Sequence, residues 1–145
     1  MSVFLENNYV MIRTETKFAV RYYETDQMAI VHHSNYIRYF ETARDEFLIE
    51  IGYPVEEVDK DGVMFALVSL DCHYRHPMRM GDTVVATCEV DTLPAVKFII
   101  KQEVYNQDGV LCADGTVVLA FLSKATGRPC RCPEKLLRLL EAKMG

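Results

Sequence analysis

One short segment, residues 22–36, concentrates the side chains that could do chemistry. An aspartate, two adjacent histidines and two flanking tyrosines lie within it: Tyr22, Asp26, His32, His33 and Tyr36. A carboxylate in such a place can act as a nucleophile, or as a general base towards water. Carbonyl chemistry of that kind also needs hydrogen-bond donors that stabilise the oxyanion of a tetrahedral intermediate.

Backbone amides can supply these donors, because a long helix is predicted to begin directly after the segment. The first N–H groups of a helix lack intrahelical partners, and the helix dipole adds positive potential at the same end. The segment therefore combines a carboxylate with amide donors. A structural interpretation stands beside this one, since an Asp or Ser before a helix is commonly a cap and paired histidines are commonly hydrogen-bonded loop residues.

The helix itself is predicted over about residues 35–51. Its apolar side chains recur at the helical period, at Tyr36, Phe40, Ala43, Phe47 and Ile51. Ser34 or Asn35 is expected to cap its start, and Gly52 to end it in a left-handed conformation. Arg44 falls within the apolar arc, so its side chain is expected to reach the edge of that arc and solvent.

Most of the remaining chain is predicted to form strands. One strand is expected over 16–24, and four more over about 64–76, 83–90, 96–104 and 110–123, before a short helix over about 133–144. Short connections between the last four strands imply antiparallel neighbours. The predicted fold class is α+β, with a curved antiparallel sheet wrapped around one long central helix. We expect a single domain over 1–145, with its core at about 16–124.

Composition narrows the possible partners and location. The 145 residues are 50% apolar and carry a net charge of −5, without a basic block, which argues against nucleic acid as a partner. The longest apolar run, 117–122, is too short to span a bilayer, and residues 1–8 lack a signal-peptide pattern. We expect a cytoplasmic protein.

Because a sheet with free edges around one helix leaves surface uncovered, a homodimer or homotetramer is also expected.

The five cysteines indicate free thiols rather than a metal site. An odd number of cysteines without a secretion signal suits a reducing compartment. Cys130 and Cys132, with His73 or His76, could offer soft ligands, but a single residue between two cysteines is not the usual zinc spacing. No metal is therefore predicted.

Two stretches of the chain resemble a known family. The run DQMAIVHHSNY at 26–36, followed by FETAR at 40–44, resembles the signature of the 4-hydroxybenzoyl-CoA thioesterase family, which has the hotdog fold. The run YRHPMRMGD at 74–82 is similar to that family's pattern of an aromatic residue, a proline and a Gly-Asp turn. The resemblance covers about residues 16–124. Ala29 departs from it, because many members carry glycine there.

The resemblance implies hydrolysis of an acyl-CoA thioester to the free acid and CoA. It implies a catalytic aspartate at Asp26, and a backbone N–H at His33 that polarises the thioester carbonyl, with the His33 side chain also implicated. Tyr22 and Tyr36 match positions near the acyl pocket. It further implies a dimer or tetramer with sites at the subunit interface. Coenzyme A enters as part of the substrate, so no separate cofactor is expected.

Two other functions remain open at this stage. An acyl-thioester hydratase or dehydratase could share the fold, but the hydratase signature places Asp and His five residues apart, whereas Asp26 precedes His32 by six and His33 by seven. A non-catalytic acyl-thioester binding module would keep an apolar pocket without needing a carboxylate at position 26. The sequence does not select the acyl group, CoA over acyl-carrier protein, or nucleophilic over general-base use of Asp26.

Overall fold

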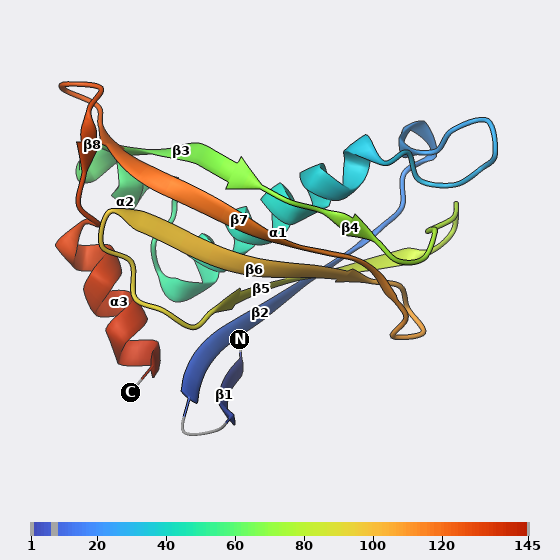
Figure 1. Cartoon of the computed structure of the whole chain (residues 1–145), viewed down its shortest axis with the longest axis horizontal. Coiled ribbons are helices and arrows are strands. Elements are labelled where there is room, and N and C mark those ends of the chain that lie inside the picture. Colours follow the sequence, from blue (N-terminus) through green and yellow to red (C-terminus); the bar gives the residue numbers. More distant parts are fainter. Residues whose placement is uncertain (1, 7–8, 145) are drawn as a thin grey trace.

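The computed structural model describes residues 2–6 and 9–144, in which one antiparallel sheet curves around a single long helix (Figure 1). The strands are β1 (Ser2–Glu6), β2 (Tyr9–Ala19), β3 (Val63–Leu70), β4 (His73–Tyr74), β5 (Thr83–Val90), β6 (Lys97–Tyr105), β7 (Leu111–Ser123) and β8 (Pro129–Cys130). The helices are the 3-10 turn η1 (Tyr22–Glu24), α1 (Ser34–Ile51), α2 (Val55–Lys60) and α3 (Glu134–Met144). The predicted α+β architecture is confirmed.

The central helix α1 buries the stripe that the sequence predicts. Its buried apolar side chains are Tyr36, Tyr39, Phe40, Ala43, Phe47 and Ile51. Gly52 ends the helix with φ 94°, as expected for a left-handed C-terminal residue. The predicted cap was wrong, because His33 is the N-cap residue and the ring of His32, rather than Ser34 or Asn35, accepts an N–H of the first turn.

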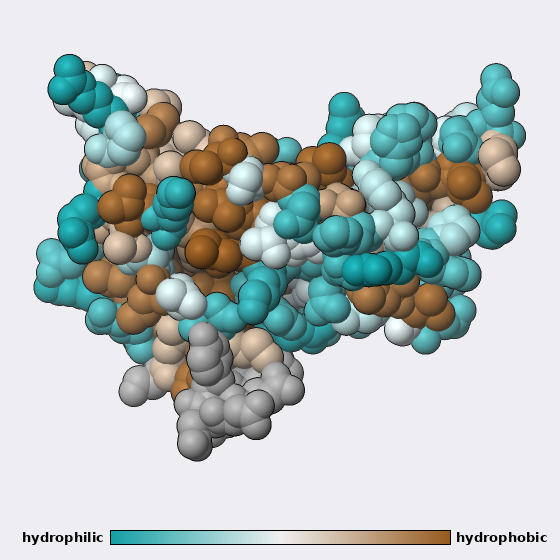
Figure 2. Space-filling model, in the orientation of Figure 1, coloured by the Kyte–Doolittle hydropathy of each residue, from teal (hydrophilic) through white to brown (hydrophobic). Residues whose placement is uncertain are grey.

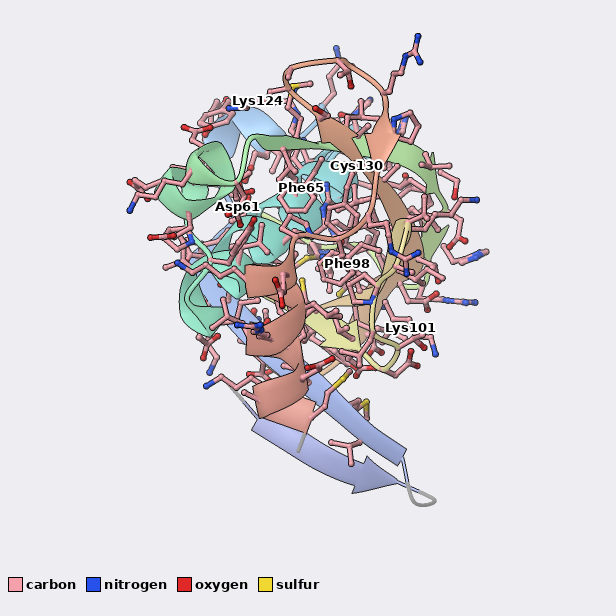
Figure 3. The ribbon with its side chains drawn as sticks, turned by 90° about the vertical axis from the view of Figure 1, so that its left-hand side faces the viewer. Asp61, Phe65, Phe98, Lys101, Lys124 and Cys130 are labelled. Atoms are coloured by element: carbon pink, nitrogen blue, oxygen red, sulfur yellow. The ribbon has the colours of Figure 1, made fainter. Side chains whose placement is uncertain are left out.

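The core lies between α1 and the concave face of the sheet. Side chains of β6 alternate strictly, with Phe98, Ile100, Gln102 and Val104 buried on the helix side. The ring of Phe98 stacks on Phe121 at a centroid distance of 6.1 Å and meets Phe47 of α1 at 6.4 Å. Figure 3 shows Phe65 and Phe98 pointing into the interior, whereas Lys101 points away from it. Burying each such ring contributes about 2–3 kcal/mol, so these contacts fix the helix on the sheet.

The sheet order corrects one prediction. Within the described chain the order is β1-β2-β5-β6-β7-β3. The edge strand β3 therefore pairs with β7, and not with β5, which corresponds to the next predicted strand, 83–90. Residues 71–82 cross beneath the start of α1 instead of forming a tight turn, and they place β5 beside β2. The predicted strand 64–76 is also divided into β3 and β4 by residues 71–72, and within β3 a register shift separates Leu67 from Ser69.

Arg44 is half-buried, and its charged end contacts the sheet, which the sequence did not predict. Its guanidinium Nη1 donates to the side-chain oxygen of Gln102 at 2.9 Å, and Gln102 is 1% exposed. Burial lowers the pKa of Arg44. The side chain turns towards the sheet because Gln102 offers a buried acceptor that the helical pattern of the sequence could not reveal.

Several element boundaries differ from the predicted ones. The strand expected at 16–24 begins at Tyr9 and ends at Ala19, and residues 22–24 form η1. The elements β1, α2 and β8 were not predicted. Among the described residues, no helix is both long and apolar enough to cross a membrane. Residues 1 and 7–8, part of the stretch examined for a signal peptide, lie outside the described residues.

Candidate active site

Asp26 lies in a tight turn between η1 and α1. Its backbone N–H donates to the Ile30 carbonyl at 2.8 Å, and Ala29 N–H donates back to the Asp26 carbonyl at 3.0 Å. One carboxylate oxygen, Oδ1, accepts the Met28 N–H at 2.8 Å. Oδ2 makes no hydrogen bond to any residue that the structure describes. The turn thus fixes an exposed carboxylate and leaves one oxygen available.

Glu24 anchors this turn to the central helix. Its carboxylate is 5% exposed and accepts the Tyr39 hydroxyl at 3.0 Å and the Arg21 N–H at 2.7 Å. Its backbone carbonyl accepts the His32 N–H at 2.9 Å and the Asn35 side-chain amide at 2.8 Å. Neither Glu24 nor Asn35 was predicted to be a site residue. The polar side chains at these positions were a signal, but only the fold shows that both are buried.

The segment that crosses beneath α1 supports the turn from below. Val31 N–H donates to the Met78 carbonyl at 2.8 Å, and Met78 N–H donates to the Tyr36 hydroxyl at 3.1 Å. Ile30 forms an isolated bridge with Arg79. Tyr36 is 3% exposed, and burial raises the pKa of its hydroxyl, which therefore stays neutral in this position. The fold places Tyr36 under the site, as a support for its backbone.

The N-cap residue of α1, His33, presents a free amide. His32 Nδ1 accepts the Ser34 N–H at 3.2 Å and lies 2.8 Å from the Ser34 hydroxyl. Asn35 N–H donates to the His32 carbonyl at 2.9 Å. The N–H of His33 has no hydrogen-bond partner in the described part of the chain. His33 is exposed, and this donor lies at the positive end of an 18-residue helix.

A hollow of about 550 Å³ lies beside the turn. Its lining residues are Tyr22, Tyr23, Thr25, Asp26, Gln27, Ala29 and Met80. The structure therefore brings two of the four predicted site residues, Asp26 and Tyr22, to one cavity. His33 lies at the adjoining helix start, and Tyr36 lies beneath, and neither lines this hollow in the single chain.

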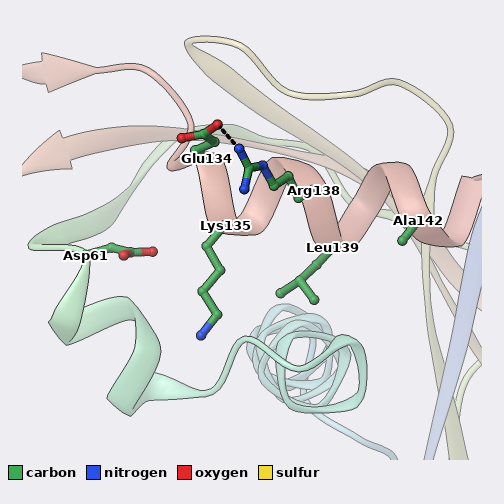
Figure 4. Close-up of a pocket in the computed structure, with 6 residues that line it drawn as sticks. All are labelled: Asp61, Glu134, Lys135, Arg138, Leu139 and Ala142. Atoms are coloured by element: carbon green, nitrogen blue, oxygen red, sulfur yellow. Dashed lines mark hydrogen bonds and ion pairs between the residues drawn. The ribbon is translucent and has the colours of Figure 1, made fainter.

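Another hollow, at the opposite end of α1, lacks these features. It lies between α3 and the turn after α2 (Figure 4), lined by Asp61, Glu134, Lys135, Arg138, Leu139 and Ala142. Glu134 pairs with Arg138, Lys135 pairs with Glu57, and Asp61 accepts the Tyr53 hydroxyl. None of the four predicted site residues lines this hollow, and its acidic side chains bind an arginine or a tyrosine hydroxyl.

Comparison with known proteins places most of the chain in one protein family. The family model described as the thioesterase-like superfamily matches residues 20–140. The acyl-CoA thioesterase YbgC of Helicobacter pylori is 25% identical over 131 residues, which cover 85% of this chain and 96% of that protein.

Similar solved structures extend the comparison. The hypothetical protein TT1821 of Thermus thermophilus is 36% identical with a TM-score of 0.81, covering 88% of this chain and 97% of that one. A 4-hydroxybenzoyl-CoA thioesterase variant in complex with 4-hydroxybenzoyl-CoA has a TM-score of 0.79 at 16% identity, over 88% of this chain and 98% of that one. At that identity the likeness concerns the fold alone, and it confirms the predicted hotdog fold.

Proposed function

The chain belongs to the thioesterase-like superfamily, and we propose that it hydrolyses an acyl-CoA thioester to the free acid and CoA at the Asp26 turn and the start of α1. Membership confirms the predicted family and the predicted enzyme class, a thioesterase. The roles of individual residues are the part that we propose from the geometry.

The single observation that carries the proposal is the arrangement of Asp26 and His33. Asp26 has a free carboxylate oxygen in a turn that Glu24 fixes to α1, and His33 offers a free N–H at the helix start. A carboxylate and a preorganised amide donor are the two groups that thioester hydrolysis needs. One such donor contributes about 3 kcal/mol to transition-state stabilisation, so the amide matters as much as the carboxylate.

The reaction balances in either of two ways. With Asp26 as general base, it takes a proton from water, the water oxygen bonds to the carbonyl carbon, the C–S bond breaks, and the proton passes to the departing thiolate of CoA. With Asp26 as nucleophile, its oxygen forms a mixed anhydride and releases the thiolate, and water then hydrolyses the anhydride. In both, the His33 N–H holds the oxyanion, and no group beyond the substrate and water is required.

The two tyrosines and the His33 side chain complete the proposed site. Tyr22 is mostly exposed beside Asp26, where its ring can contact the acyl group. Tyr36 forms the floor below the helix start, and the exposed His33 ring, 4.0 Å from that of His32, can contact the thioester. We do not assign the acyl group, because aromatic and aliphatic chains both suit these side chains.

A homo-oligomer fits the free edge of the sheet. β3 pairs only with β7 within the described residues, so its other edge is open. Met64, Leu67 and Val68 of β3 are exposed, and Figure 2 shows apolar side chains gathered over β3, β7 and β6. An open apolar edge strand is suited to pairing with a second copy. We therefore propose a dimer or tetramer in which β3 lies at an interface.

A thiol-release assay with acetyl-, octanoyl- and benzoyl-CoA tests the proposed function. Asp26→Asn keeps an oxygen acceptor for the Met28 N–H but removes the charge, so we expect kcat to fall at least about 100-fold with the fold intact. Asp108→Asn, at an exposed hairpin turn, is the matched control and should retain full activity. Binding of these thioesters without thiol release would favour the binding module. An active Asp26→Asn variant would exclude Asp26 as the catalytic group.

A further inference from the structure

We propose that Tyr74 is a positioning residue: it fixes the peptide group that follows His33, and through the His33 Cα it sets the direction in which the free His33 N–H points, towards the substrate carbonyl. This inference rests on the proposed function and names a residue that acts through His33 rather than by touching the substrate. The Tyr74 hydroxyl donates to the His33 carbonyl oxygen at 3.0 Å. The two residues are far apart in sequence, so this bond is a tertiary contact between β4 and the start of α1.

The Tyr74 ring is packed as well as hydrogen-bonded. Its centroid lies 5.3 Å from that of Tyr36, with an interplanar angle of 77°, and 6.4 Å from that of His33, with an angle of 82°. Both contacts have the edge-to-face geometry that aromatic rings prefer. The ring thus brings the hydroxyl to the His33 carbonyl from a fixed direction, although Tyr74 is 51% exposed.

The fold provides a rigid base for this side chain. Tyr74 pairs with Ala113, and His73 with Asp114, so β4 is fixed to β7. Just before β4, Asp71 N–H donates to the Thr116 carbonyl at 3.1 Å, and Thr116 N–H donates to Asp71 Oδ1 at 3.0 Å.

Gly115 makes this path of the chain possible. A Cβ added at Gly115 would lie 2.0 Å from the Asp71 carbonyl oxygen, a distance that no side chain tolerates. The absence of a side chain therefore lets residues 71–72 pass close to β7 and directs Tyr74 towards α1. Leu70 pairs with Val117 and His73 with Asp114 in the same register, so residues 71–72 stay alongside β7 between the two strands.

The chemical reason for such a contact is the direction of the His33 amide. An oxyanion donor is effective only when it is held at the position that the developing charge will occupy. His33 is the N-cap residue, so its N–H is not constrained by a helical hydrogen bond. Burial raises the pKa of Tyr74, and its hydroxyl therefore remains a donor at neutral pH.

Tyr74→Phe tests the inference, because it removes the hydroxyl and keeps the ring that packs on Tyr36. We expect kcat for the best thioester of the panel to fall about tenfold while KM changes less than about twofold. Tyr105→Phe is the matched control, since it removes a hydroxyl that donates to Glu103 at 2.7 Å on a strand position that faces away from the buried side of β6. Unchanged kcat in Tyr74→Phe, or an equal loss in Tyr105→Phe, would overturn the inference.

A second measurement does not depend on activity. The backbone amide of His33 is followed by ¹H–¹⁵N NMR in the substrate-free protein and in both variants. We expect its resonance to shift and its hydrogen exchange to change in Tyr74→Phe and not in Tyr105→Phe. If the wild-type protein hydrolyses none of the thioesters, the proposed function fails, and the NMR result alone decides the positioning role. A His33 amide that is the same in all three proteins would refute that role.

Discussion

The Tyr39 hydroxyl donates to the buried Glu24 carboxylate at 3.0 Å, which joins the second turn of α1 to the segment that carries Asp26. Burial and the neighbouring Glu24 raise the pKa of Tyr39, so the hydroxyl is a permanent donor near neutral pH. The orientation of the Asp26 turn therefore depends on a bond made within the helix–turn interface rather than on the turn alone.

Tyr39→Phe should weaken both the fold and the site. Glu24 keeps its bond from the Arg21 N–H but loses a donor in a buried place, so we expect the free energy of unfolding to drop by about 1–3 kcal/mol. We also expect kcat to fall, because the turn is held less firmly. Urea unfolding and the thiol-release assay measure the two effects. Wild-type stability in this variant would show that the bond contributes nothing.

Arg44 and Gln102 should be energetically coupled. Gln102→Leu removes the acceptor of the Arg44 guanidinium and the donor to the Phe40 carbonyl, and we expect it to lower the free energy of unfolding by about 2–4 kcal/mol. Arg44→Met combined with Gln102→Leu should recover part of that loss, because no buried cation remains without an acceptor. A double-mutant cycle by urea unfolding measures the coupling. Strictly additive effects would contradict it.

Ala29→Gly should stabilise the protein. Ala29 has φ 60°, and it is the one non-glycine residue with positive φ among the described residues. Glycine adopts this conformation without the steric cost of about 1 kcal/mol that a Cβ brings, and Ala29 is exposed, so no packing is lost. We expect a gain of about 0.5–1 kcal/mol in urea unfolding. Ala125→Gly, in an exposed turn without positive φ, is the control and should be neutral or destabilising.

Stability should fall at alkaline pH. Burial raises the pKa of Cys88 to about 12. The unfolded state therefore loses this proton first, and the free energy of unfolding decreases as the pH rises from about 8.5 towards 12. Urea unfolding under reducing conditions at pH 7, 9 and 10.5 should show this slope. Cys88→Ala should have a shallower slope than the wild-type protein, and an identical slope would mean that Cys88 is not responsible.

Much of the fold could be predicted because it depends on local patterns. The stripe from Tyr36 to Ile51 predicted α1, Gly52 predicted its end, and the alternation in 96–104 predicted the buried side of β6. The sheet order could not be predicted in the same way. Alternating residues show which face of a strand is buried, but they do not show which strand lies beside it, and β3 pairs with β7 rather than β5.

The same division holds for the candidate site. The family resemblance pointed to Asp26, His33, Tyr22 and Tyr36, and their catalytic and binding roles stay predictions, as do the single-domain boundaries and the cytoplasmic location. The importance of Glu24 could not be predicted from its polar side chain alone, because its burial and its bond with Tyr39 exist only once α1 packs against the turn.

By itself, the sequence determined the central helix, the strand content, the family and the segment that carries the carboxylate, since each depends on residues that are close along the chain. Only the tertiary structure decided that Tyr36 is buried, that Arg44 turns to Gln102, and that Tyr74 reaches His33. These contacts join residues up to 58 positions apart. They are set by how the strands cross and pack, and no local periodicity specifies that.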